Sequence, residues 1–136
     1  VIFKLNVMKI KIKAVSKINP QDLTLAPKFY AKIVPNGHTD LKRLSSLISK
    51  GSTVMRNDIY AVLIGLVDII EDELSQGRTV GLGELGRMRL SVNSEGSVLE
   101  EDVSSTNIKK TKIIYRPGPD LLKKLKILEF EKEQSP

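Results

Sequence analysis

The stretch Gly77-Arg-Thr-Val-Gly-Leu-Gly-Glu-Leu-Gly-Arg-Met-Arg-Leu90 joins a helical middle to a β-rich end in this chain of 136 residues. Gly81, Gly83 and Gly86 have the spacing G-x-G-x-x-G, which in a dinucleotide-binding motif requires a strand before it and a helix after it. The residues that follow Gly86 instead alternate between charged and apolar side chains, which is typical of a half-buried strand. We therefore exclude a dinucleotide site and interpret the glycines as a tight connection between strands, where they allow positive φ and close backbone approach.

Two helices are expected before this stretch. Thr39 is the expected N-cap of a helix that begins near Asp40, and Gly51 is placed to end it. A second helix is expected from Arg56 to Ser75, with apolar residues around most of its circumference. Such a helix needs burial on more than one side, and a partner subunit is a candidate for the second side.

Further strands and one short helix are expected after the glycines. Alternation predicts strands over Arg78–Leu82, Arg87–Val92 and Ile108–Tyr115, with a polar excursion between the last two. Pro117-Gly118 ends the last strand, and an apolar stripe of leucines predicts a helix from Asp120 to Leu128. Residues 129–136 are expected to form a flexible tail.

The front of the chain has a different pattern. Met8 to Lys17 alternates isoleucine with lysine. Lys28 to Val34 places Phe29, Ala31 and Ile33 on one face and Tyr30 and Lys32 on the other, so two strands are expected there. We assign residues 1–38 to an N-terminal β extension and residues 39–128 to the main domain. Met8 is a possible natural start, which would make Val1–Val7 an extension of the chain.

Composition excludes several classes of function. The chain has no cysteine, one histidine and a formal net charge of +6, so thiolate catalysis, Cys-ligated zinc and a multi-His metal site are excluded. No apolar run approaches the ~20 residues that span a membrane. We expect a soluble, intracellular, basic protein that is not an enzyme, with no catalytic residues, cofactor or metal.

The order of elements and three segments resemble the HU and integration host factor family of bacterial DNA-bending proteins. The resemblance is carried by Gly77-Arg-Thr-Val80, by Gly83-Glu-Leu-Gly-Arg-Met-Arg-Leu90, and by Ile113-Ile-Tyr-Arg-Pro-Gly118 with Leu121-Leu-Lys-Lys-Leu125. It covers about residues 40–126, and the β extension is similar to one found in HU-like proteins of Bacteroides-type bacteria.

The resemblance implies an α+β, IHF-like DNA-binding fold: a two-helix body, a three-stranded sheet with a β-ribbon arm, a C-terminal helix and an N-terminal two-stranded extension. It also implies a cytoplasmic, nucleoid-associated homodimer that condenses DNA and binds double-stranded DNA without sequence preference, largely through phosphates. The DNA-binding positions carried over from the family are Gly86, Arg87, Arg89, Lys109, Lys110, Lys112, Arg116, Pro117, Gly118, Lys123 and Lys124.

The expected arm tip departs from the family pattern. No proline lies between Pro35 and Pro117, whereas the family inserts an arm-tip proline between base pairs. The tip instead carries Glu95, Glu100, Glu101 and Asp102, which phosphate repels. Weak bending is therefore expected, and the alternative is a protein-interaction module that uses the acidic tip and the β extension and binds little DNA.

Overall fold

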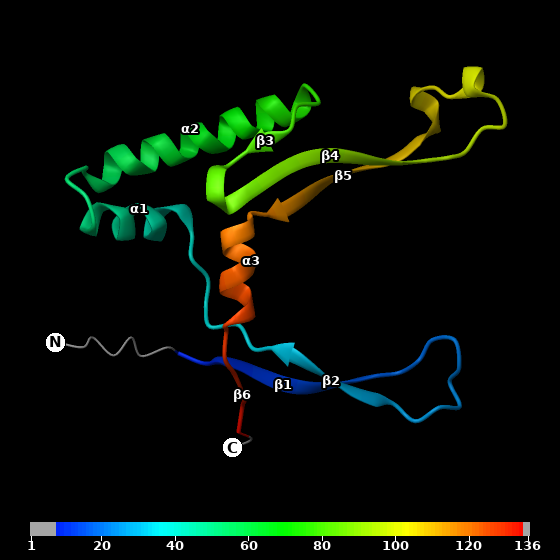
Figure 1. Cartoon of the computed structure of the whole chain (residues 1–136), viewed down its shortest axis with the longest axis horizontal. Helices are drawn as coiled ribbons and strands as arrows, with labels where there is room; N and C mark the ends of the chain where they lie inside the picture. The colour runs from blue at the N-terminus through cyan, green and yellow to red at the C-terminus, as the bar shows by residue number, and fades with distance from the viewer. Residues whose placement is uncertain (1–7, 135–136) are drawn as a thin grey trace. The chain divides into compact units, whose positions relative to one another are not determined.

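The computed structural model describes residues 8–134, which form a mixed α+β protein with two compact units (Figure 1). One unit comprises residues 39–123. The other comprises the described parts of residues 1–38 and 124–136. The expectation for Val1–Val7 lies outside the described residues.

The first unit begins with two helices, α1 (Leu41–Lys50) and α2 (Arg56–Ser75), which pack against each other. Their bounds agree with the sequence prediction, but the expected N-cap, Thr39, is wrong. Asp40 is the N-cap, because its carboxylate accepts a hydrogen bond of 2.9 Å from the backbone N–H of Arg43.

A small core holds the two helices together. The buried apolar side chains among residues 8–134 are Ile59 and Leu74 on α2, and Ser45 on α1 is fully buried. The Ser45 hydroxyl donates to the backbone carbonyl of Leu41 at 2.7 Å, so its burial leaves no unpaired polar group. Several apolar side chains of α2, among them Val62 and Ile69, are left exposed by the described part of the chain.

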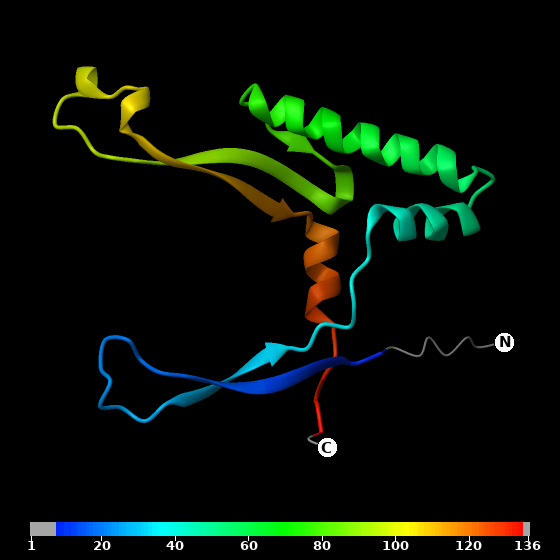
Figure 2. The ribbon, with the colours of Figure 1, turned by 180° about the vertical axis from the view of Figure 1, so that it is seen from behind.

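The same unit continues into an antiparallel sheet of order β3-β4-β5, comprising β3 (Val80–Gly81), β4 (Gly86–Ser94) and β5 (Ile108–Pro117). A 3₁₀ turn over Gly83–Leu85 connects β3 to β4, so the glycines lead into a strand, as predicted. Strand β3 is shorter than expected. The β4–β5 ribbon extends away from α1 and α2 (Figure 2), and α3 (Pro119–Lys126) follows it.

The second unit is a three-stranded sheet of order β2-β1-β6, where the sequence suggested two strands and a flexible tail. Strands β1 (Ile10–Lys17) and β2 (Lys28–Ile33) are antiparallel, and β6 (Phe130–Lys132) pairs with β1 in parallel. The expectation of a flexible tail over 129–136 is wrong for β6. The backbone N–H of Ile10 donates to the carbonyl of Glu129 at 2.9 Å, and Phe130 lies in register with Ile10.

Candidate nucleic-acid interface

The β4–β5 ribbon separates its side chains by character. Residues directly opposite each other in an antiparallel pair share a face, and successive residues alternate between faces. Arg87 pairs with Arg116, Ser91 with Lys112, and Asn93 with Lys110. One face of the ribbon, which we call the basic face, therefore carries Arg87, Arg89, Lys110, Lys112 and Arg116.

The opposite face of the ribbon is largely apolar. It carries Met88, Leu90, Val92, Ile113 and Tyr115, of which Met88 and Leu90 are half-buried. The Tyr115 hydroxyl donates to the backbone carbonyl of Leu85 and so ties β5 to the turn before β4. Because most of the apolar side chains lie on the opposite face, the basic face presents its cations to a ligand with one large apolar residue, Ile114, among them.

Positive charge is concentrated where the ribbon begins. Arg87 and Arg116 lie directly opposite each other, a placement that is unfavourable for like charges. With Arg89, Thr79 and Ile114 they line an open hollow of about 280 Å³. Sequence reasoning missed Thr79, which reaches the hollow because β3 pairs with β4.

No carboxylate among the described residues forms an ion pair with the basic face. Within residues 8–134 the ion pairs are Arg78 with Glu73 at 2.9 Å and Lys109 with Glu95 at 3.0 Å, and neither involves this face. The five cations therefore produce a local positive potential that suits an anion with several charges, such as a polyphosphate chain.

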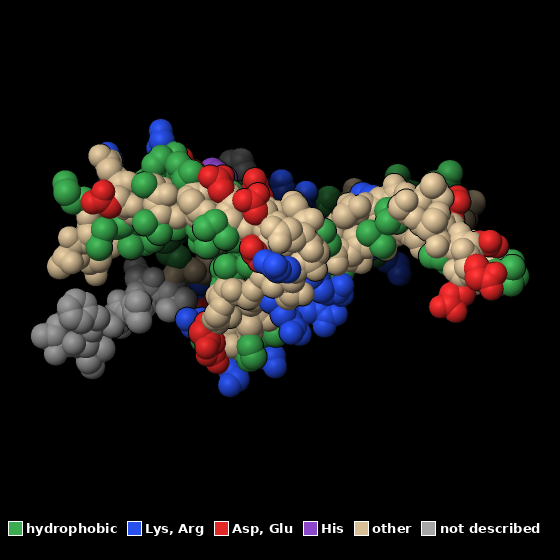
Figure 3. Space-filling view, turned by 90° about the horizontal axis from the view of Figure 1, so that it is seen from above, with side chains coloured by type: hydrophobic (Ala, Val, Ile, Leu, Met, Phe, Trp, Pro, Cys, Tyr) green, Lys and Arg blue, Asp and Glu red, His purple; other side chains and the backbone are tan. Residues whose placement is uncertain are grey.

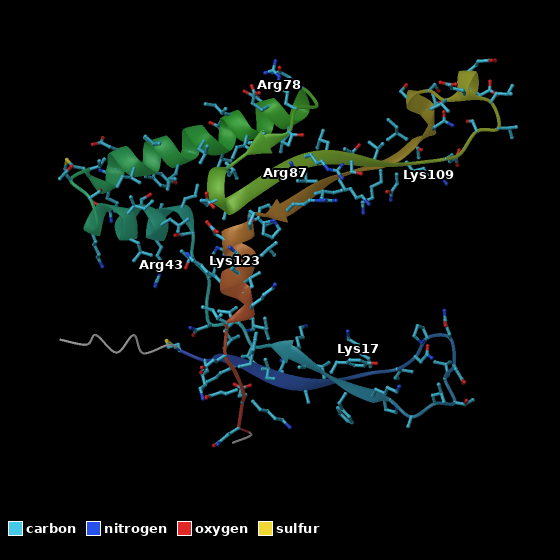
Figure 4. The ribbon with its side chains drawn as sticks, in the orientation of Figure 1. Lys17, Arg43, Arg78, Arg87, Lys109 and Lys123 are labelled. Atoms are coloured by element: carbon cyan, nitrogen blue, oxygen red, sulfur yellow. The ribbon has the colours of Figure 1, made fainter. Side chains whose placement is uncertain are left out.

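Lys109 lies apart from the basic face. Alternation along β5 directs it to the apolar face, and its ammonium contacts the Glu95 carboxylate near the arm tip. Lys123 and Lys124 are exposed on α3 rather than on the ribbon; Figure 4 labels Arg87, Lys109 and Lys123 on their elements.

Gly86, Pro117 and Gly118 shape the start of the ribbon. A Cβ atom on Gly86 would collide with the backbone oxygen of Arg116 and would lie 2.9 Å from Pro117 Cα. Gly118 is buried, and a Cβ there would collide with the backbone of Glu84. These residues therefore hold the backbone that positions Arg87 and Arg116.

The far end of the ribbon is acidic. Residues 95–107 include two 3₁₀ turns, Glu100–Asp102 and Ser105–Asn107. The backbone N–H of Ser104 donates to the Asn107 side chain at 2.7 Å, which orders the return to β5. Acidic side chains gather at this end of the ribbon in Figure 3. The tip exposes three large apolar side chains, Val98, Leu99 and Val103.

Two further features of the described residues bear on function. No group of three His, Cys, Asp or Glu side chains within residues 8–134 is arranged to hold a metal ion. None of the described helices is both long and apolar enough to span a membrane.

The chain is therefore an α+β protein with a β-ribbon arm, and the basic face of this ribbon suits a polyanion. The chain belongs to the HU-HIG family, described as an HU domain fused to a winged helix-turn-helix, Ig or glycine-rich motif, and the match covers residues 8–132. Among curated proteins, no sequence matches the chain significantly.

A solved structure has a similar fold. It is that of a candidate bacterial DNA-binding protein from Bacteroides vulgatus, with a TM-score of 0.61 and 14% sequence identity. The match covers 95% of this chain and 51% of that protein, so this chain spans about half the length of its structural relative.

Proposed function

We propose that this protein binds double-stranded DNA through the basic face of its ribbon, by contacts to phosphates and without sequence preference. The observation that carries the proposal is the placement of five cations on one ribbon face with no carboxylate partner among the described residues. Membership of a family defined by an HU domain supports it. We infer an IHF-like arrangement of residues 39–128 and a nucleoid-associated, cytoplasmic protein that condenses DNA.

The named positions have different roles in this proposal. The basic face contacts phosphates directly, while Gly86, Pro117 and Gly118 hold the ribbon backbone. Lys123 and Lys124 contribute weaker phosphate contacts from α3, and Lys109 acts mainly through its ion pair with Glu95.

We propose that the protein acts as a homodimer. On α2, Val62, Leu66 and Ile69 form a stripe at helical spacing, with exposed fractions of 70%, 44% and 62% in the single chain. An uncovered apolar stripe of this kind is typical of a subunit interface. A second copy that covers the stripe would complete the small core formed by Ile59 and Leu74.

The bending of DNA is expected to be weak. The arm tip has no proline to insert between base pairs, and its carboxylates are repelled by phosphate. A fluorescence energy-transfer assay on end-labelled duplexes is expected to show a smaller bend than proline-tipped relatives produce. A sharp kink would contradict this part of the proposal.

A titration of a labelled duplex at two salt concentrations tests DNA binding. For a phosphate-directed binder, log K falls linearly with log salt, by about 0.9 for each phosphate contact. The variant Arg87→Ala with Arg116→Ala removes two opposed cations of the basic face, so it should weaken binding and flatten the salt dependence. Arg43→Ala with Arg56→Ala is the matched control, because it removes the same charge from the helices.

The result that would overturn the proposal is absence of binding at low salt, or binding that is indifferent to salt and to the ribbon substitutions. That result would favour the second candidate function, a protein-interaction module. The specific observation behind this candidate is the arm tip, where Val98 and Leu99 are exposed beside Glu100–Asp102.

A further inference from the structure

The sheet of the second unit has a lysine-rich face of its own. In the β1–β2 register, Lys13 lies directly across from Lys32, and Lys17 lies directly across from Lys28. Lys11 is two residues before Lys13 on β1 and so shares its face. We call this surface the lysine face; it consists of Lys11, Lys13, Lys17, Lys28 and Lys32.

The lysines of this face form no ion pair with a carboxylate among residues 8–134. At the β6 edge of the face, Glu131 lies in register with Lys11, and Glu129 and Glu133, two residues before and after it, share its side of the sheet and are held to β1 by backbone hydrogen bonds with Ile10 and Ile12. The Asp22 carboxylate in the β1–β2 loop is occupied by the backbone N–H and the hydroxyl of Thr24. Five cations therefore face one another and solvent.

This arrangement is unfavourable for the isolated protein. Like charges directly opposite each other in a sheet are destabilising, and the face contains two such lysine pairs. An anion with regularly spaced charges would offset this repulsion between lysines, because each lysine would gain a partner of opposite charge. The register of β1 and β2 thus favours a polyanionic ligand.

The spacing and chemistry of the face suit duplex DNA. Alternate residues on a strand are about 6.6 Å apart, and a DNA strand carries one phosphate for about every 3.4 Å of helix axis, so a regular row of lysines faces a dense and regular row of phosphates. Tyr30 lies on the same face, with the Lys17 ammonium 5.3 Å from its ring centre.

A lipid surface fits the lysine face less well. The larger apolar side chains of the sheet, among them Ile12, Phe29 and Ile33, lie on its opposite face. A peripheral membrane-binding surface combines cations with apolar groups that enter the lipid. Duplex DNA, which needs only the cations, is therefore the better match.

We propose that the lysine face is a second phosphate-binding surface for double-stranded DNA, separate from the basic face of the ribbon. Each chain then has one DNA-contacting surface in each of its two units. The proposal rests on the charges and register of β1 and β2, and it stands or falls independently of the ribbon.

The test compares variants that lose the same charge from different places. Lys13→Gln with Lys32→Gln removes one opposed pair from the lysine face. Lys132→Gln with Lys42→Gln is the matched control: Lys132, in register with Ile12, is on the other face of the same sheet, and Lys42 is exposed on α1.

Duplex titrations between 50 and 200 mM salt should show a slope of log K against log salt that is shallower by about 1.8 per chain for the lysine-face variant, because two phosphate contacts are lost. The ratio of its affinities at the two salt concentrations should then change about tenfold relative to the control. A slope and affinity equal to those of the control would overturn the proposal.

Adding the same substitutions to the ribbon variant, Arg87→Ala with Arg116→Ala, separates this inference from the proposed function. Residual binding of the ribbon variant should weaken further, and its salt dependence should become shallower by about 1.8 per chain, when Lys13 and Lys32 are also replaced. If only the ribbon substitutions weaken binding, the lysine-face proposal fails and the proposed function stands. If only the lysine substitutions weaken binding, the lysine-face proposal stands and DNA binding through the ribbon is wrong.

Two controls complete the experiment. Thermal unfolding of the Lys13→Gln, Lys32→Gln variant should occur at an unchanged or higher temperature, because both side chains are exposed and repel each other. Vesicles of phosphatidylcholine and phosphatidylserine test the lipid alternative. Loss of vesicle binding with unchanged DNA binding would overturn the assignment to DNA.

Discussion

Replacing Gly86 by alanine is expected to destabilise the start of the ribbon strongly. Gly86 has φ 122° and ψ −154°, a combination that is essentially confined to glycine. A Cβ atom would also collide with the Arg116 carbonyl and lie 2.9 Å from Pro117 Cα. Because both neighbours are backbone atoms, neither can rotate away, and β4 would have to separate from β5.

The backbone strain and the steric overlap at residue 86 should each cost a similar amount of free energy. A residue forced into this backbone region costs about 1–3 kcal/mol, and overpacking against a rigid neighbour typically costs about 1–3 kcal/mol more. The expected loss is therefore about 2–6 kcal/mol of the free energy of unfolding. For a domain of this size each kcal/mol lowers Tm by about 4–8 °C, so a fall of at least about 8 °C is expected.

Neighbouring glycines separate these contributions. Gly83 has φ 60° and no atom within 4 Å of an added Cβ, so Gly83→Ala should cost about 1–2 kcal/mol through conformation alone. Gly118→Ala meets the backbone of Glu84 at ordinary φ and tests steric overlap alone. Gly81→Ala has neither problem and should remain within about 0.5 kcal/mol of the original protein.

Thermal unfolding followed by circular dichroism, with all variants at one protein concentration, measures the series. The reasoning is refuted if Gly86→Ala is no more destabilising than Gly81→Ala. It is also refuted if Gly86→Ala costs less than either Gly83→Ala or Gly118→Ala.

Three further outcomes are expected. Asp40→Ala should lower stability by about 1 kcal/mol in a denaturant titration, because the Arg43 amide loses its capping acceptor. Hydrogen bonds from the hydroxyl and backbone N–H of Thr24 lower the pKa of Asp22 below its ordinary 3.8. Their stabilising effect is therefore present above pH 3.8 and is lost as the pH falls through the lowered pKa; an NMR titration should find that pKa, and Thr24→Val should raise it. If the protein is a dimer, the Tm of the original protein should rise with protein concentration. Val62→Glu would bury a charge on the exposed α2 stripe in that dimer, so it should abolish the rise and give a monomeric mass in sedimentation.

Features that depend on neighbours in the chain could be predicted from the sequence. The bounds of α2 and the alternation of β4 follow from the spacing of apolar residues, which records the local geometry of helix and strand. The same period predicts that Lys110 and Lys112 share a face and that Lys109 lies on the other. The contact of Lys109 with Glu95 required the fold of the arm tip.

Features that depend on distant partners could not be predicted. Strand β6 forms because Phe130 meets Ile10, and nothing in the short segment around Phe130 specifies that parallel pairing. The choice of Asp40 rather than Thr39 as N-cap depended on which oxygen reaches the Arg43 amide.

The sequence by itself determined the helices, the alternating strands, the glycine-rich connection and the excess of cations over carboxylates, because composition and period are local properties of the chain. Only the tertiary structure decided which cations stand together. The register of β4 and β5 places Arg87 against Arg116, and the register of β1 and β2 places Lys13 against Lys32. Register is set by pairing between distant segments, and a shift of one residue would move every one of these charges on a strand to the other face.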